Sequence, residues 1–139
     1  MTESEGGRIT LRPLVPEGFA HSSARLNYSP GVLVEGGRLV FCSGQVGRAA
    51  DGEVISDPIE QYVAAFENVR LVLAEAEASF ADVVELMTFH TTFDGFDLFV
   101  AVKDRYVTDP AYPAWTAIGV SALALPGLLA EIRATAVIR

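Results

Sequence analysis

The chain has 139 residues, of which 50% are hydrophobic, and its formal net charge is −8 at pH 7. This length is typical of one domain, and the apolar content is enough to build a core without disulfides or metals. The acidic balance repels phosphate backbones, which argues against a nucleic acid as a partner. We therefore expect one domain over residues 1–139.

The first residues, 1–7, carry neither the basic start nor the apolar run of a secretory signal. No later stretch approaches the roughly 18 apolar residues of a membrane span, so the expected location is the cytoplasm, without a membrane partner. Cys42 is the single cysteine and lies in an apolar run, which predicts a buried thiol in a reducing compartment. No neighbouring lysine or histidine would activate it as a nucleophile.

The N-terminal segment, residues 1–27, is predicted to form an edge strand followed by a covering loop. Pro13 and Pro16 disfavour a regular helix here. The next segment, residues 32–41, contains two β-rich runs around a Gly-Gly pair at residues 36–37. Such a pair between two runs predicts a β-hairpin.

A helix is predicted from residue 57 to about residue 78. Asp57 is typical of an N-cap, Pro58 fits the first helical position, and Glu60 reaches back as in a capping box. Apolar residues then recur at three- and four-residue steps, as in a helix that covers a sheet. They are Ile59, Tyr62, Val63, Phe66, Val69 and Leu73.

A strand over residues 82–93 is predicted from its β-branched and aromatic residues. A second helix begins near Asp94 and ends before Pro110. Two strands, 114–123 and 130–138, complete the chain and are joined by a Pro-Gly turn. The inner face of the second helix is expected to carry Phe96, Phe99, Val100, Tyr106 and Val107.

The element order ββ-α-β-α-ββ predicts an α+β fold, in which a mixed β-sheet carries two helices on one face. The other face would present Phe41, Phe89 and Ile118 to solvent. Apolar faces of this kind are usually covered. We therefore expect a closed homo-oligomer in which the sheets pack against one another.

Alternation along the strand from residue 114 places Trp115, Ala117, Gly119 and Ser121 on one face. A large indole beside three small side chains leaves open volume. Either this volume is a pocket or the seat of an approaching neighbour, or it is filled by the helices of an ordinary core. Glu131 and Arg133 share one face of the last strand. If the last two strands form a hairpin, Glu131 and Trp115 border the same cavity.

An ordered set of motifs runs from about Tyr28 to Val137, most of the chain. The motifs are Tyr28-Ser29-Pro30, Leu39-Val40-Phe41-Cys42-Ser43-Gly44-Gln45, Phe66-Glu67-Asn68-Val69, Pro113-Ala114 and Glu131-Ile132-Arg133-Ala134. Together they resemble the reactive-intermediate deaminase family, called RidA or YjgF-type. The ordered set is much more specific than any one of its motifs.

His90, with the segment 112–120, resembles the YjgH-like branch of this family. That branch lacks the arginine that follows Pro-Ala in other members and holds the carboxylate of the substrate. In this chain Trp115 stands at that position, and Ala117 stands where a cysteine is frequent.

The resemblance implies a chorismate-mutase-like fold and a homotrimer with three clefts at the subunit interfaces. It also implies hydrolysis of 2-imino or 2-aminoacrylate-type intermediates to 2-oxo acids and ammonia, without a metal or an organic cofactor. In the family, backbone groups near the Ser-Gly pair contact the substrate, and a glutamate on the last strand positions the attacking water. The matching positions in this chain are Tyr28, Ser43, Gly44 and Glu131.

Trp115 in place of the arginine predicts an altered substrate range. An unpaired buried charge costs about 3–5 kcal/mol, which corresponds to roughly two to three powers of ten in affinity. The indole instead offers an apolar wall and one N–H donor, which suits a flat or aromatic ligand. Arg133 is a candidate anion ligand or a plain partner of Glu131, and His90 is a candidate acid, base or donor or a structural histidine.

The first functional hypothesis is therefore an imine or enamine deaminase in which Glu131 orients water beside the Ser43-Gly44 backbone. The alternative is a non-catalytic trimer that binds a small molecule in the same cleft. An endoribonuclease is the third hypothesis, against which the acidic charge argues. Two histidines far apart in sequence and one cysteine do not form a metal-ligand pattern, so no metal site is expected.

Overall fold

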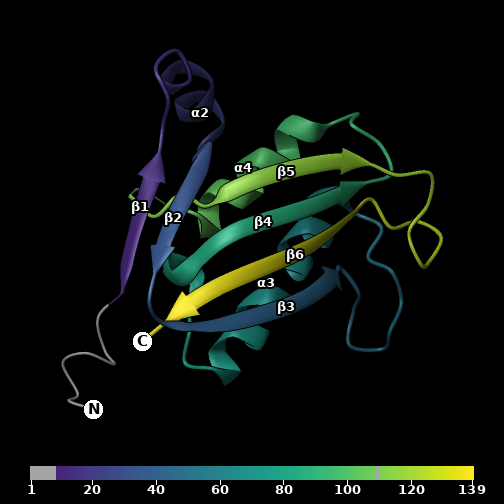
Figure 1. Ribbon diagram of the computed structural model, residues 1–139. Coiled ribbons are helices and arrows are strands. Elements are labelled where there is room, and N and C mark those ends of the chain that lie inside the picture. The colour runs from purple at the N-terminus through teal and green to yellow at the C-terminus, as the bar shows by residue number, and fades with distance from the viewer. Residues whose placement is uncertain (1–8, 109) are drawn as a thin grey trace.

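The chain folds into a four-stranded sheet with two long helices on one face, beside a separate two-stranded sheet (Figure 1). This computed structural model describes residues 9–108 and 110–139. The predicted α+β fold is confirmed, although residues 1–8 of the predicted N-terminal strand and loop lie outside the described residues. The elements in chain order are β1 (Thr10–Leu14), α2 (Ala20–Leu26), β2 (Gly31–Glu35), β3 (Arg38–Val46), α3 (Pro58–Glu75), the 3-10 turn η1 (Phe80–Asp82), β4 (Val83–His90), α4 (Phe96–Tyr106), β5 (Ala114–Gly119) and β6 (Ala130–Ile138).

The four-stranded sheet has the order β3-β6-β4-β5. β4 and β5 are parallel, because α4 forms the crossover between them, whereas β6 is antiparallel to both of its neighbours. The last strand is thus inserted between β3 and β4. The predicted hairpin of the last two strands is wrong, since β4 lies between them, and β5 ends at Gly119 rather than at residue 123.

The predicted hairpin over residues 32–41 is also wrong. β2 pairs with β1, and β3 pairs with β6 in the other sheet. Gly36 and Gly37, with φ values of 79° and 86°, turn the chain from one sheet into the next. A Cβ on Gly37 would lie 2.6 Å from Val137 Cγ1, so this corner needs glycine to pack against the end of β6.

The N-terminal segment contains the short helix α2, where the sequence predicted a loop. α2 has seven residues, no side-chain N-cap bond and mostly exposed side chains. Such a helix has no apolar stripe from which it could be predicted. It ends at Asn27, which adopts the left-handed conformation with φ 54° and donates its N–H to Ser23 O.

The core lies between the sheet and the pair α3 and α4. The start of α3 agrees with the prediction: Pro58 is the first helical residue, and Asp57 accepts from the Glu60 N–H at 2.9 Å. Phe66 of α3 stacks on Tyr106 of α4 at a centroid distance of 5.1 Å. Burial of one such side chain contributes roughly 1.5–3 kcal/mol. Fully buried core residues include Phe66, Val69, Leu73, Leu86, Phe99 and Ile132.

Gln61 of α3 joins the loop between β3 and α3 to the loop between β5 and β6. Its buried amide donates to Ile55 O at 2.8 Å and to Gly127 O at 3.1 Å, and its oxygen accepts from the Leu129 N–H at 2.7 Å. Both N–H groups and the carbonyl are therefore used. This one side chain therefore holds the loop before α3 and the loop before β6 to the helix α3.

We expect Gln61→Leu to lower the free energy of unfolding by about 3 kcal/mol, because two carbonyls and one N–H lose their partner inside the protein. Urea denaturation followed by circular dichroism measures this loss. Glu75→Gln, an exposed change at the end of the same helix, is the control and should stay close to the wild type. Equal stability of Gln61→Leu and the wild type would contradict the prediction.

Candidate functional site

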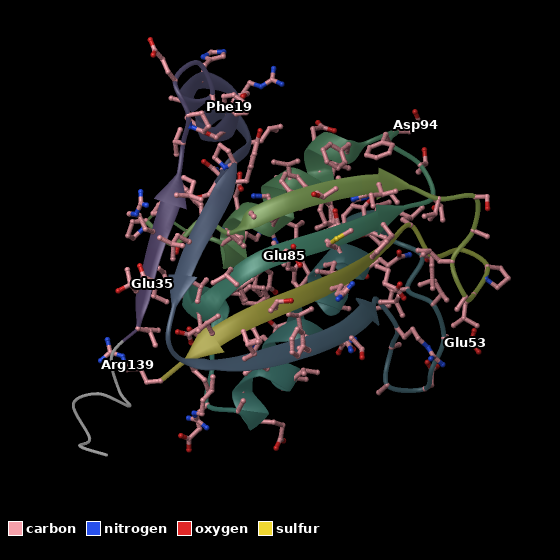
Figure 2. The ribbon with its side chains drawn as sticks, in the orientation of Figure 1. Phe19, Glu35, Glu53, Glu85, Asp94 and Arg139 are labelled. Carbon is pink, nitrogen blue, oxygen red and sulfur yellow. The ribbon has the colours of Figure 1, made fainter. Side chains whose placement is uncertain are left out.

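The predicted site residues form two groups on opposite faces of the four-stranded sheet. Trp115 pairs with the buried Leu86 and shares the face turned toward α4. Glu131 pairs with Phe89, three positions further along β4, and an odd number of positions reverses the face. The expectation that Glu131 and Trp115 border one cavity is therefore wrong for a single protomer. Figure 2 labels Glu85 on the second, open face, in front of the helices.

Ser43 and Gly44 form a bulge in β3. The register between β3 and β6 shifts between Cys42 and Gln45, so that both bulge residues lie opposite Arg133. A bulge takes backbone groups out of the strand ladder and is common beside functional sites. Here one of those groups, Ser43 O, accepts from Gln45 Nε2 at 3.1 Å.

The carboxylate of Glu131 lies against the backbone of Gly44. A Cβ at position 44 would be 2.6 Å from Glu131 Cδ and 2.9 Å from Glu131 Oε2, so a larger residue there would displace the flexible end of the Glu131 side chain. Arg133 is exposed on the same face, but no ion pair joins it to Glu131 in the described part of the chain. Ser43, Gly44, Glu131 and Arg133 thus form the open-face group.

Trp115 packs against α4. Its ring stacks on Phe96 at 5.8 Å with an interplanar angle of 12°, and Phe99 lies at 6.4 Å. Side chains of the protein's own helix α4 therefore lie against the indole, as in an ordinary core. The rings of Tyr28 and the half-buried Trp115 meet in a T-shaped arrangement at a centroid distance of 6.3 Å, and these two residues form the helix-face group.

The indole N–H of Trp115 is occupied within the protein. It donates to Thr88 Oγ1 at 2.9 Å, and Thr88 Oγ1 lies 2.8 Å from His90 Nε2. An indole N–H can only donate, so the Thr88 oxygen accepts from it, whereas the direction of the Thr88–His90 hydrogen bond is set by the His90 tautomer. The one N–H donor of the indole is thus already used inside the protomer.

His90 is a buried, neutral histidine. It is 2% exposed, and the rings of Phe99, Phe93 and Phe96 lie 4.6, 5.2 and 5.2 Å from its own. Burial among these rings lowers the pKa of His90 from 6.5 to about 4. Of the alternatives left open by the sequence, this agrees with a structural histidine that holds its neighbours in place.

Two residues that contact Trp115 were missed from the sequence, Thr88 and Lys103. Lys103 Nζ lies 4.8 Å from the centroid of the Trp115 ring. The spacing of Phe96, Phe99 and Lys103 puts all three on one side of α4. Lys103 was missed because only apolar residues were sought on α4, although its spacing from Phe96 and Phe99 places it on the same side of the helix.

The segment that carries Tyr28 is fastened to the start of β5 by Ser29. Ser29 Oγ donates to Tyr112 O at 2.6 Å, and the Ser29 N–H donates to Pro113 O at 2.8 Å. These bonds bridge more than eighty residues of sequence. They explain why Tyr28 and Trp115, distant in the chain, meet at one edge of the sheet.

Cys42 is buried, as predicted, and burial raises the pKa of its thiol, which disfavours the reactive thiolate.

Within residues 9–108 and 110–139, no three His, Cys, Asp or Glu side chains come together in a way that could hold a metal ion. In the same described residues, no helix is both long and apolar enough to cross a membrane.

Comparisons with known proteins agree on one family. The model of the Endoribonuclease L-PSP family matches residues 20–138. The RutC family protein YjgH of Escherichia coli is 37% identical over 110 residues, 78% of this chain and 82% of that protein, and Protein DfrA of Myxococcus xanthus is 37% identical over 112 residues, 79% of this chain and 84% of that protein. The crystal structure of the conserved Rid-family protein YyfB of Yersinia pestis has a TM-score of 0.82 at 33% identity and covers 92% of this chain and 98% of its own.

The lowered pKa of His90 predicts a pH-dependent stability. Between pH 6.5 and about 4 the unfolded state binds a proton that folded His90 does not bind, so stability falls as the pH falls through this window. From pH 7 to pH 5 this group should remove about 2 kcal/mol from the free energy of unfolding. Urea denaturation at both pH values should show a smaller loss for His90→Gln than for the wild type. His21→Gln, at an exposed position of α2, should keep the wild-type loss.

Proposed function

The chain belongs to the RidA/YjgF family, and on that premise we propose that it hydrolyses a reactive imine or enamine to a carbonyl compound and ammonia. The observation that carries the proposal is the position of Glu131 against the Gly44 backbone. The family resemblance gives these two positions to the acid that holds water and to the backbone that contacts the substrate.

In the proposed reaction, water adds to the imine carbon. Glu131 accepts a hydrogen bond from this water and directs its oxygen toward the carbon, as a positioned carboxylate does in general-base catalysis. The new C–O bond forms while the C=N bond becomes single, and loss of ammonia then leaves the C=O group. Both protons of the water end on the nitrogen, so the step needs no cofactor.

The reaction site in this proposal is a cleft between protomers of a homotrimer. Within one protomer the open-face group and the helix-face group cannot reach the same ligand, because the sheet separates them. Contact between copies would bring one group of each kind together. Leu39, Phe41 and Ile118 are exposed on the open face and supply apolar surface for such packing.

The proposed substrate does not depend on a carboxylate. Trp115 stands where the family arginine binds that group, and its N–H is already bonded to Thr88. The indole therefore offers only apolar and stacking contacts, together with the edge of Tyr28. A flat, neutral imine fits this wall better than a simple imino acid.

The unpaired, buried Cys42 agrees with a reducing compartment, and we place the reaction in the cytoplasm.

A non-catalytic trimer that binds a small molecule in the same cleft is the alternative. The observation that favours it is that position 115 holds no arginine, while the indole N–H that could donate in its place is already bonded to Thr88. The endoribonuclease activity in the name of the family model is a weaker candidate, because a net charge of −8 opposes RNA binding. Cleavage of single-stranded RNA that disappears in Glu131→Ala would support it instead.

We expect Glu131→Gln to reduce ammonia release from freshly generated imines about 100-fold, because an amide orients water less well than a carboxylate. Steady-state ammonia assays with a carboxylate-free imine measure this effect. Glu85→Gln removes another carboxylate from the open face and serves as the matched control. If the wild type releases no ammonia above background while a ligand still quenches Trp115 fluorescence, the binding alternative holds.

Phe41→Glu is expected to convert the proposed trimer into monomers. Phe41 is 68% exposed in the protomer, and a buried carboxylate at a sheet-to-sheet contact would be left without a partner. Sedimentation velocity gives the mass of each species. Leu71→Glu, at a 54% exposed position of α3, introduces the same charge on the helical side and should leave the mass unchanged. Wild-type protein that sediments as a monomer would contradict the trimer itself.

A further inference from the structure

Lys103 is the only lysine of the sequence, and it lies beneath the only tryptophan. The side chain is 1% exposed, whereas lysines are almost never fully buried unless they are paired. Burial lowers the pKa of Lys103, and the neighbouring Asp104 carboxylate opposes this shift. A charge placed at such a position requires a specific set of partners.

The partners of the Lys103 ammonium come from two elements. Nζ donates to Asn27 O at 2.9 Å and to Leu26 O at 3.1 Å, at the end of α2. Asp104 Oδ1 lies 3.2 Å away and supplies the counter-charge. Because Tyr28 follows Asn27 directly, Lys103 fixes the segment from which the Tyr28 ring extends.

The same ammonium also contacts the other aromatic residue of the helix-face group. Nζ lies 4.8 Å from the centroid of the Trp115 ring, within the range of a cation–π interaction. Thr88 holds the indole by its N–H, and Lys103 holds it by its face. One side chain thus joins Tyr28 and Trp115, whose rings are 6.3 Å apart.

We infer that Lys103 is the positioning and specificity-determining residue of this subsite. Lys103 fixes Tyr28 and Trp115, and its charge excludes a second cation at position 115. The inference rests on the proposed function in one respect: it takes Tyr28 and Trp115 as walls of the ligand subsite. An arginine at position 115 would bring its guanidinium close to the Lys103 ammonium. Two positive charges close together in a poorly hydrated site disfavour each other.

The positioning role is tested by the fluorescence of Trp115, which is the only indole of the chain. Lys103→Met should raise the acrylamide quenching constant of Trp115 about twofold or more, because the indole loses one of its two polar contacts. Lys103→Arg keeps a cation and should restore most of the protection. Arg105→Met, on the exposed side of α4, is the control. A folded Lys103→Met with wild-type quenching would overturn the positioning role.

A second measurement needs no substitution and so does not depend on the folding of a variant. Reductive methylation of the native protein with formaldehyde and a borane reductant should leave Lys103 unmodified, as its burial and its partners require, and should modify it after unfolding in urea. Mass spectrometry of proteolytic peptides identifies the modified amine. Rapid methylation of Lys103 in the folded protein would overturn the inferred arrangement.

The specificity role is tested with pyruvate as a carboxylate probe. Trp115→Arg alone should bind pyruvate weakly, and Trp115→Arg combined with Lys103→Met should bind it at least about tenfold more tightly, because the competing cation is gone. Titration calorimetry on the full chain measures both affinities. Equal affinities, or no binding by the double variant, would overturn the specificity role. Neither this comparison nor the quenching result needs turnover, so a failure of the proposed deaminase activity is observed separately.

Discussion

The position of β4 between β5 and β6 is the constraint from which the arrangement of the site follows. Side chains alternate along β4, and the register carries this alternation into both neighbours. Trp115 is thereby directed toward the helices and Glu131 toward the open face. Any chemistry that uses both residues must therefore involve more than one copy of the chain.

The helix-face group shows how polar atoms are accommodated inside an aromatic layer. Trp115 donates to Thr88, and Thr88 bonds to a His90 that burial keeps neutral. The indole N–H, the Thr88 hydroxyl and His90 Nε2 each have a partner, which reduces the usual penalty for burying polar groups. The only polar atom of the Trp115 indole thus has a partner inside the protein.

The sequence predicted the helices α3 and α4, the strands β3 to β6 and the separate faces of β6 because each has a periodic pattern or a capping signal. It did not predict strand partners: the Gly36–Gly37 pair reads as a hairpin, yet it connects two sheets. Partner choice depends on contacts between distant segments, such as those of Ser29 with residues 112–113. For the same reason the Tyr28–Trp115 contact and the role of Lys103 became visible only in three dimensions.

The place of β6 in the sheet has a consequence for folding. The last strand of the chain is an inner strand, with β3 on one side and β4 on the other. β3 and β4 therefore keep unpaired edges until β6 docks between them, and closure of the sheet requires contacts of long sequence separation. We expect a partly folded chain in which β6 has not yet docked to present these open edges to chaperones.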